Sequence, residues 1–336
     1  VDTTNPVLTL LGDANVSQAK DSAWADPGAT ASDSLDGNLT SSITITGTVD
    51  VNTTGVYTLT YSISDGASNE ANATRVVNVG QASTHNADLN ASVQLQMLWV
   101  EPGTFTMGSP TTETDRSTNE TEHNVTLTKG FYLGKYEVTQ AQYEAVMTGN
   151  TDSLSATPSE WPNNPNRPVE KVSWADAQIF LTRLNAQQSA NIPAGWAYVL
   201  PTESQWEYAC RAGTSTAYSW GATIASSNAN YNWDGAWNTG NDFKQTRDVG
   251  QYAANPWGFF DMHGNVLEWT ADWYGATYPT GNPVVDPSGP ASGSFRVVRG
   301  DSWGSDGPAL RSARRNHRPP SDRSRSLGFR VGFQKQ

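Results

Sequence analysis

The chain contains a single cysteine, Cys210, among its 336 residues. No disulfide can form within it, and a redox centre built from two thiols is excluded. No apolar run approaches the roughly 20 residues of a membrane-spanning helix, so we expect no direct membrane insertion of this fragment. Basic residues are also few: 21 Lys and Arg face 33 Asp and Glu, for a formal net charge of −12. This balance argues against nucleic acid as a partner, because phosphates require a basic surface.

The sequence begins at Val1 without a methionine or a signal-like stretch. We therefore take it as a fragment or mature form whose targeting or anchoring segment lies upstream. Glycine, asparagine, serine and threonine are plentiful, and there are 13 tryptophans. This composition favours a loop-rich globular protein over a helical one.

Residues 1–80 alternate apolar residues with Thr or Ser in short runs, at 7–10, 43–45 and 56–63, separated by turn sequences. Short strands at such intervals predict an all-β sandwich. The order "DTTNPVLTLLG … DPGATASDSLDGNLT … GVYTLTYSISDGASNEA" resembles the immunoglobulin-like modules of bacterial and archaeal surface proteins. The resemblance implies a spacer with no site of its own.

Residues 81–92 are small and polar without periodicity, and we predict a linker there. A second domain is expected over residues 93–336. Helical spacing of apolar residues predicts helices near 139–147 and 173–187, and a short third helix near 202–212. Long irregular loops with brief strands follow, so an α+β domain is predicted.

Six local motifs of this second domain resemble the formylglycine-generating-enzyme (sulfatase-modifying factor) family, in the family's order from about Trp99 to Phe333. They are "VEPGTFTMGS", "GFYLGKYEVTQAQYEAVM", "RPVEKVSWADAQIF", "LPTESQWEYACRAGT", "GFFDMHGNVLEWTADWY" and "RVVRGDSWG … LGFRVGF". The resemblance implies an elaborated C-type-lectin-like fold, with little regular structure and a small sheet that presents loops.

Active members of that family bind copper through two cysteines, since soft thiolates suit Cu(I). The positions that match these cysteines are Ser305 and Leu310, so the resemblance implies no copper site and no oxidase activity. Cys210 matches a structural cysteine. A related branch holds iron with histidines, but His85, His123, His263 and His317 lack the close pairing of an iron site.

The run from 261 to 268 resembles the family's calcium loop, and hard oxygen ligands from a turn suit Ca²⁺. The implied ligands are the side chains of Asp261 and Glu268 and the carbonyls of Gly264 and Val266. The alternative is that the two acidic residues only cap the loop or form salt bridges in it. A second implied site would use Asn230, the Tyr231 carbonyl, and Asn241 or Asp242.

The segment from about 300 to 331 resembles the variable region of a diversity-generating retroelement, in which AAC-type codons are copied with errors at adenines. Such errors give Asn, Ser, Asp, Gly, His or Arg, and never Lys, Glu, Gln, Met or Trp. Residues 304–326 contain none of these five unreachable types. The resemblance implies that the interspersed residues contact the ligand. They are Asp301, Gly304, Ser305, Asp306, Arg314, Asn316, His317, Arg318, Ser321, Asp322, Ser324, Arg325 and Ser326.

The remaining residues of this segment fit the family framework. We expect Arg311, Arg315, Arg323 and Arg330 to pair with carboxylates, and Trp303 to pack beneath the variable loop. Only Arg314, Arg318 and Arg325 are expected at the surface.

Together these patterns predict a non-catalytic, receptor-type protein displayed on a cell or virion surface, within a larger assembly and facing an unknown protein or cell-surface ligand. Two alternatives stay open. One is a metal-dependent oxidase of the formylglycine or sulfoxide-forming type. The other is a structural paralogue whose C-terminal segment is fixed.

Overall fold

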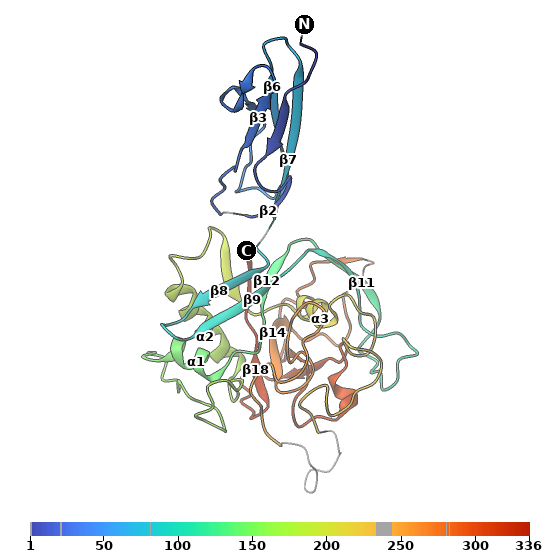
Figure 1. The fold of residues 1–336 in the computed structure, drawn as a ribbon. Coiled ribbons are helices and arrows are strands. Elements are labelled where there is room, and N and C mark those ends of the chain that lie inside the picture. Colours follow the sequence, from blue (N-terminus) through green and yellow to red (C-terminus); the bar gives the residue numbers. More distant parts are fainter. Residues whose placement is uncertain (1, 21, 81, 233–243, 280, 282) are drawn as a thin grey trace. The chain divides into compact units, whose positions relative to one another are not determined.

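The computed structural model describes residues 2–20, 22–80, 82–232, 244–279, 281 and 283–336. The chain divides into two compact units, one ending at Ser83 and the other running from Thr84 to Gln336 (Figure 1). We refer to them as the N-terminal and the C-terminal domain.

The N-terminal domain consists of two sheets, with strand orders β1-β3-β4 and β2-β7-β6-β5. Its elements are β1 (Val7–Leu10), β2 (Asn15–Ala19), β3 (Ala29–Asp33), β4 (Gly37–Asn38), the 3-10 turn η1 (Thr40–Ser42), β5 (Thr44–Thr46), β6 (Gly55–Ser64) and β7 (Glu70–Gly80). The three strand segments predicted from the sequence lie within one residue of β1, β5 and β6.

Alternation along β6 and β7 forms the core of this domain. Tyr61 and Val77 are fully buried, because every second side chain of a strand points to the same face. Arg75 is also fully buried. Its guanidinium donates hydrogen bonds to the Asp26 carboxylate and to the Tyr61 hydroxyl, which compensate the buried charge.

The predicted linker over 81–92 is wrong from residue 84 onward. Strand β8 (Thr84–Asp88) pairs antiparallel with β9 (Gln94–Val100) as the first hairpin of the C-terminal domain. Ala87, Leu89 and Leu95 are buried in the main core. The small polar residues of this segment occupy the exposed positions of an edge strand, and a low-hydropathy edge strand is difficult to distinguish from a linker by composition.

The C-terminal domain contains three sheets, with orders β13-β19-β12-β9-β8, β17-β16-β14-β18 and β10-β11-β15. Their remaining strands are β10 (Gly103–Met107), β11 (His123–Leu127), β12 (Phe131–Gly134), β13 (Trp196–Val199), β14 (Leu267–Trp273), β15 (Val284–Val285), β16 (Arg296–Arg299), β17 (Asn316–Arg318), β18 (Leu327–Phe329) and β19 (Gly332–Lys335).

All three predicted helices are present: α1 (Gln140–Met147), α2 (Trp174–Gln187) and α3 (Glu203–Arg211). Each begins with a capping box, in which the side chain of Thr139, Ser173 or Thr202 accepts a hydrogen bond from the backbone amide of the third helical residue. The side chain of that residue in turn accepts a hydrogen bond from the backbone amide of the capping residue. This reciprocal bonding satisfies amide groups that have no partner within the helix.

The main core joins α1 and α2 to the five-stranded and four-stranded sheets. The Tyr143 ring stacks on Phe180 with centroids 5.5 Å apart, and Phe180 meets Phe329 of β18 edge to face at 5.2 Å. Trp269 of β14 is fully buried and donates its indole N–H to the Val172 carbonyl. These contacts fix β14 and β18, and with them the sheet that carries the C-terminal segment. Among the described residues, no helix has both the length and the apolar character to cross a membrane.

Candidate ligand-binding surface

Residues 300–331 run from the end of β16 through the 3-10 turn η2 (Gly307–Leu310) and β17 to β18. Within this segment, exposure separates most of the predicted contact residues from the framework. The framework residues Pro320 and Arg323 are partly or fully exposed, so the expectation that only Arg314, Arg318 and Arg325 lie at the surface is wrong for Arg323, whose side chain is 49% exposed while it pairs with Asp176. Those that are partly or fully exposed are Gly304, Ser305, Asp306, Arg314, Asn316, His317, Arg318, Ser321, Asp322, Ser324, Arg325 and Ser326. Framework residues that are buried are Gly300, Ser302, Trp303, Arg311, Ala313, Arg315, Gly328, Phe329 and Arg330.

Asp301 is the exception among the predicted contact residues, since only 6% of it is exposed. Its backbone is left-handed, with φ 53°, and its carboxylate accepts a hydrogen bond from the Ser305 hydroxyl at 2.5 Å. Burial raises the pKa of Asp301, while Ser305, Arg314, Arg318 and Asn316 act against that rise. Asp301 therefore organises four predicted contact residues from below and is not itself available to a ligand.

Buried ion pairs hold the framework arginines, as predicted. Arg315 contacts both carboxylate oxygens of Glu203 at 2.7 Å, and Arg299 of β16 binds Glu203 and Glu207. Burial alone would raise the pKa of Glu203, but Arg315 and Arg299 lower it below its ordinary value. A two-point guanidinium–carboxylate contact fixes orientation as well as charge. These pairs connect the C-terminal segment to helix α3.

Three more arginines tie the segment to other parts of the domain. Arg311 binds Glu113 and Glu120, Arg323 binds Asp176 of α2, and Arg330 binds Glu268 of β14. The partners lie on separate elements, so the segment is anchored along its whole length. A scaffold of this kind holds its surface side chains without depending on their identity.

Trp303 lies under the exposed loops, as expected. Its ring meets Trp161 edge to face at 5.6 Å, and the Arg325 guanidinium lies 5.2 Å from its centroid. The Trp303 indole N–H donates to the Arg325 carbonyl at 3.3 Å. Trp303 thus joins the beginning and the end of the variable segment.

His317 and Arg318 lie on the edge strand β17. The His317 ring stacks on Tyr274 at 4.2 Å and contacts the edge of Phe295, while Arg318 lies 3.8 Å from Asp322. Burial, with Arg318 and Arg315 nearby, lowers the pKa of His317, so the imidazole is neutral at pH 7. This end of the surface offers an aromatic stack and an exposed guanidinium.

Neither position that matches a copper cysteine offers a metal ligand of that type. Leu310 is fully buried in an apolar cluster with Tyr218, Ala229 and Tyr231, and the Ser305 hydroxyl is bound to Asp301. The family-like Cys210 is also buried, and burial raises the pKa of its thiol to about 12. A thiol with this pKa is protonated at neutral pH and is a poor ligand and nucleophile.

The structure does not bring the histidines together as a metal centre within the part of the chain it describes. His85 stacks on Phe333 and His123 lies against Tyr278. His263 donates from Nδ1 to the Leu310 carbonyl and contacts the Ser219 hydroxyl through Nε2, and His317 lies on β17.

In the predicted calcium loop, Glu268 and Asp261 have different surroundings. Both oxygens of Glu268 accept hydrogen bonds from Arg330, and one also accepts from the Trp206 indole. Asp261 is held by the Gly250 amide. Burial raises its pKa to about 6 despite that bond and despite Arg330. Glu268 therefore shows the salt bridge that was the alternative to calcium, whereas Asp261 is a half-buried carboxylate that a cation would suit.

Glu137 adds to the negative charge at this loop. It is fully buried, and its carboxylate accepts hydrogen bonds from the Asn265 side chain and the Val266 amide. Burial, with Asp261 and Glu268 nearby, raises its pKa well above the ordinary value. Two buried carboxylates and the half-buried Asp261 thus lie near one arginine. Calcium at this loop stays a prediction.

The second predicted calcium site is only partly described. The Asn230 amide donates to the carbonyl of Gln245 and to Asn265 Oδ1, and the Tyr231 side chain is buried. Asn241 and Asp242 lie outside the described residues, so this site also remains a prediction.

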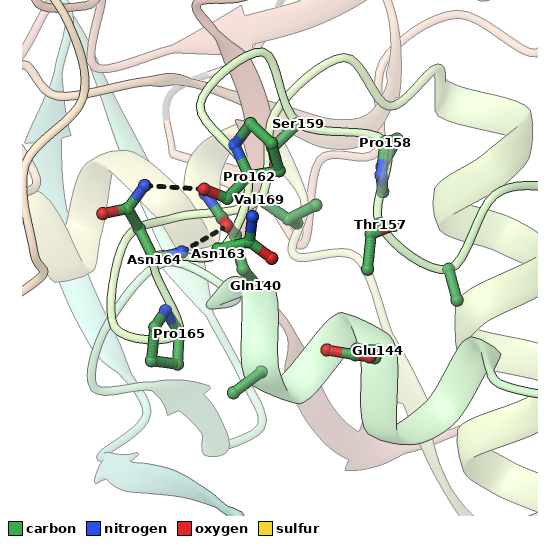
Figure 2. A pocket seen from close by; sticks show the side chains of 12 residues that line it. Gln140, Glu144, Thr157, Pro158, Ser159, Pro162, Asn163, Asn164, Pro165 and Val169 are labelled. Atoms are coloured by element: carbon green, nitrogen blue, oxygen red, sulfur yellow. Dashed lines mark hydrogen bonds between the residues drawn. The ribbon is translucent and has the colours of Figure 1, made fainter.

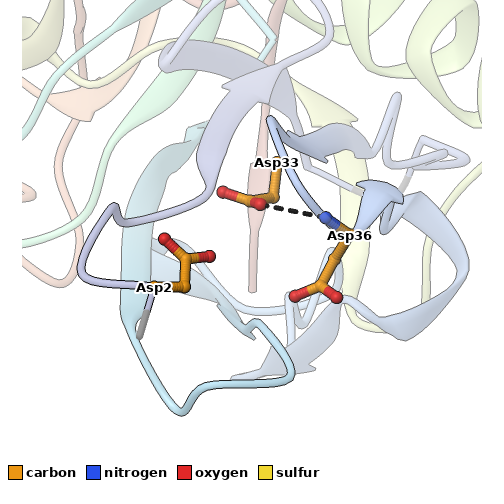
Figure 3. Close-up of side chains that lie close together, drawn as sticks. All are labelled: Asp2, Asp33 and Asp36. Carbon is orange, nitrogen blue, oxygen red and sulfur yellow. Dashed lines mark hydrogen bonds between the residues drawn. The ribbon is translucent and has the colours of Figure 1, made fainter.

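A group of acidic side chains that sequence reasoning missed lies in the N-terminal domain. Asp2, Asp33 and Asp36 place carboxylate oxygens within 4.8 Å of one another (Figure 3). Asp33 accepts from the amides of Leu35 and Asp36, and Asp36 accepts from the amide of Gly66. These bonds are typical of carboxylates that stabilise turns.

Sequence reasoning also missed the cavities, because their walls come from distant segments. The largest of those described has a volume of about 590 Å³ and lies between residues 110–115, 217–224 and 308–311. Its only residues from the variable segment are Pro308 and Arg311. A smaller pocket of about 160 Å³ lies between α1 and the loop 156–165.

The two domains each match a known family. Residues 83–334 match the sulfatase-modifying factor enzyme 1-like domain, and residues 8–79 match the immunoglobulin-like domain of bacterial surface proteins. The chain therefore belongs to the sulfatase-modifying factor family, with a C-type-lectin-like fold and an N-terminal immunoglobulin-like domain. Both resemblances inferred from the sequence motifs are confirmed.

Curated relatives include formylglycine-generating enzymes. The Streptomyces coelicolor enzyme is 37% identical over 51% of this chain, and the mouse enzyme is 29% identical over 70%. The matches span 54% and 74% of those two proteins. Among solved structures, Treponema denticola variable protein 1 is 25% identical, with a TM-score of 0.60 over 74% of this chain and 98% of its own. PvdO from Pseudomonas aeruginosa is also 25% identical, with a TM-score of 0.64 over 76% of this chain and all of its own.

Proposed function

We propose that the C-terminal domain is a non-catalytic ligand-binding domain whose contact residues lie in a segment diversified by a retroelement. The ligand would be a protein or another molecule on a cell surface. The contact surface comprises the twelve predicted contact residues from Gly304 to Ser326, all of which are exposed or partly exposed. The likeness to a variable protein of the same fold supports this reading.

The observation that carries the proposal is the division of one continuous segment by exposure. The predicted contact residues from Gly304 to Ser326 are all partly or fully exposed. Between them, Arg311, Ala313 and Arg315 are buried, and Arg323 is held in an ion pair with Asp176. A drifting loop would not be expected to confine its substitutions to outward positions while retaining four anchoring arginines. Rigid scaffolds with exchangeable small, polar and basic side chains are typical of adaptable binding surfaces.

The test of diversification is the DNA around the gene. We expect a near-copy of the codons for residues 300–331 beside a reverse transcriptase, with asparagine codons at the contact positions and mismatches confined to template adenines. A fixed segment with no such copy would contradict diversification and favour a structural paralogue.

The absence of catalysis has its own test. Copper titration and oxygen consumption with a cysteine-containing peptide are expected to give no signal above buffer, since neither Ser305 nor Leu310 offers a thiolate. Stoichiometric copper binding that survives the change Cys210→Ser would contradict this part of the proposal, because it would reveal another metal site.

Surface display accounts for the domain order. An immunoglobulin-like domain of the kind found in bacterial surface proteins precedes the binding domain, and as a spacer it would hold that domain away from its anchor. The display surface would be that of a cell or a virion, within a larger assembly. Protease or antibody access to the C-terminal domain on intact particles tests this expectation.

A further inference from the structure

A small pocket outside the variable segment has the features of a second binding site. It lies between helix α1 and the loop 156–165, and no residue of the segment 300–331 lines it. Its volume of about 160 Å³ equals roughly five water molecules at liquid density, the scale of a single sugar ring. Figure 2 shows Glu144 on the helix and Thr157 and Pro158 on the facing loop.

Hydrogen bonds to two different elements hold the second half of the loop that forms this pocket. Gln140 of α1 donates to the Trp161 carbonyl. It also accepts from the Asn164 backbone amide (Figure 2). On the other side, the fully buried Glu170 accepts from the Glu160 amide. Three prolines line the pocket and restrict the loop further: Pro158, Pro162 and Pro165. A preformed pocket binds a small ligand without the cost of ordering a loop.

Several polar groups in the pocket remain available to a ligand. No hydrogen bond or ion pair within the described chain engages the Glu144 carboxylate or the Asn163 carboxamide, and both residues are exposed. The Asn164 amide nitrogen is used by the loop carbonyls of Trp161 and Pro162, which leaves its oxygen as an acceptor. The free groups therefore combine a carboxylate, an amide that both donates and accepts, and a carbonyl-type acceptor.

The remaining wall of the pocket is mostly apolar and contains no basic side chain. Ala141, Ala156 and Val169 line it together with the prolines, and no Lys, Arg or His does. An anionic ligand would meet the Glu144 carboxylate without any compensating charge, so it is disfavoured. A neutral polyol matches these polar and apolar groups. Its hydroxyl groups would donate hydrogen bonds to Glu144 and Asn164 and accept one from Asn163, and its C–H face would pack on proline and alanine.

We propose that this pocket binds one sugar ring of a neutral carbohydrate. The site is fixed, and it stands apart from the diversified surface. The two are nevertheless neighbours, because Trp161 of the pocket loop contacts Trp303, and the Lys171 amide donates to the Ser324 carbonyl at 3.0 Å. A carbohydrate-bearing partner would thus be held at a constant subsite while the variable residues contact the rest of it. This last step rests on the proposed function, whereas sugar binding itself does not.

The experiment uses the full chain and ligand-observed NMR with free glucose, galactose, mannose and N-acetylglucosamine. At least one of these sugars is expected to show saturation transfer, with a dissociation constant on the order of 1 mM. The changes Glu144→Ala and Asn163→Ala are expected to weaken binding roughly tenfold, because each removes a direct hydrogen bond to the ligand. Glu122→Gln, at an exposed glutamate outside the pocket, is the matched control and should leave binding unchanged.

A second comparison separates a polyol from a cation. Glu144→Gln keeps a hydrogen-bond acceptor and removes the charge, so it should weaken sugar binding less than Glu144→Ala does. Propylammonium as a probe is expected not to bind. Propylammonium binding that Glu144→Gln abolishes, with no binding of any sugar, would overturn the proposal in favour of a site for a partner's lysine.

Further outcomes keep the two proposals distinct. Arg318→Asn, in the variable surface, should leave sugar binding unchanged even if the proposed function fails. Loss of sugar binding in Arg318→Asn, or full binding in both Glu144→Ala and Asn163→Ala, would show that the sugar binds outside the pocket. Either result would overturn the assignment. Both pocket residues are exposed, so unchanged melting temperatures are expected for all the variants.

Discussion

At the scale of single residues, two arginines three residues apart in the C-terminal segment differ in burial and in pairing. Arg315 is buried against Glu203, whereas 43% of the Arg318 side chain is exposed beside Asp322. Removing one member of a buried pair leaves an uncompensated charge, whereas an exposed pair contributes little. We therefore expect a substitution at a buried framework position to change the stability of the domain. A substitution at an exposed position of the segment is expected to change ligand contact and to leave stability nearly unchanged.

Arg315→Ala is expected to lower the free energy of unfolding by about 3–5 kcal/mol, because Glu203 loses its two-point partner while buried. Arg318→Ala should change it by less than about 0.5 kcal/mol. Urea unfolding of the two variants beside the parent measures both values. Equal losses in the two variants would contradict the division into framework and contact residues.

At the scale of elements, the helices hold the sheet that carries the variable segment. The capping box of α2 includes Asp176, which also binds Arg323 from that segment. The Trp174 amide, at the start of the same helix, donates to the Pro320 carbonyl at 3.0 Å. The first turn of α2 therefore stabilises the helix and positions the loop at the same time.

Ser173→Ala is expected to cost about 1 kcal/mol of stability, since the cap oxygen that accepts from the Asp176 amide is lost. Thr182→Ala, at an exposed site within the same helix, is the control and should cost little. Thermal unfolding followed by circular dichroism gives both values. A cost for Ser173→Ala no larger than that of the control would show that the cap does not limit stability.

At the scale of the whole molecule, the C-terminal domain buries more carboxylates than its arginines neutralise. Burial raises the pKa of Glu170 to about 7 and that of Asp272 to about 8. A carboxyl group whose folded pKa is raised contributes stability that is present at low pH and is lost as pH rises through that pKa. Burial lowers the pKa of His263 to about 4, so its contribution is lost as pH falls below about 6.5.

The melting temperature in calcium-free buffer is therefore expected to be higher at pH 6.5 than at pH 8.5, since only the carboxyl groups titrate strongly in this window. Glu170→Gln should flatten the dependence, because an uncharged amide replaces the group that loses its proton. Scanning calorimetry at several pH values measures the slope. A melting temperature that rises steadily from pH 6.5 to 8.5 would contradict the assignment.

Calcium is expected to raise the melting temperature more at pH 8 than at pH 6, because the ion competes with protons for Asp261, whose pKa is about 6. A free concentration one hundred times the dissociation constant adds about 2.7 kcal/mol. Asp261→Asn should abolish most of the effect, and Glu122→Gln should preserve it. A melting temperature that does not change with calcium or with a chelator would contradict calcium binding. The Glu268–Arg330 salt bridge would then be the interaction that stabilises the loop.

The sequence by itself determined the features that depend on local order along the chain. Capping residues at Thr139, Ser173 and Thr202 marked three helices, and ordered motifs identified both domains, because backbone preferences and family motifs are written in consecutive residues. It also predicted which residues of the C-terminal segment are exposed, with Asp301 and Arg323 as the exceptions.

Only the tertiary structure decided which distant groups meet. It turned Asp301 inward and paired Arg311 and Arg315 with acidic residues 191 and 112 positions away. It also enclosed the pocket lined by Glu144. It also placed residues 84–88 in a sheet, where composition had indicated a linker. Burial and pairing arise from contacts between segments that are far apart in the sequence. A single amino-acid sequence does not show directly which distant residues are in contact.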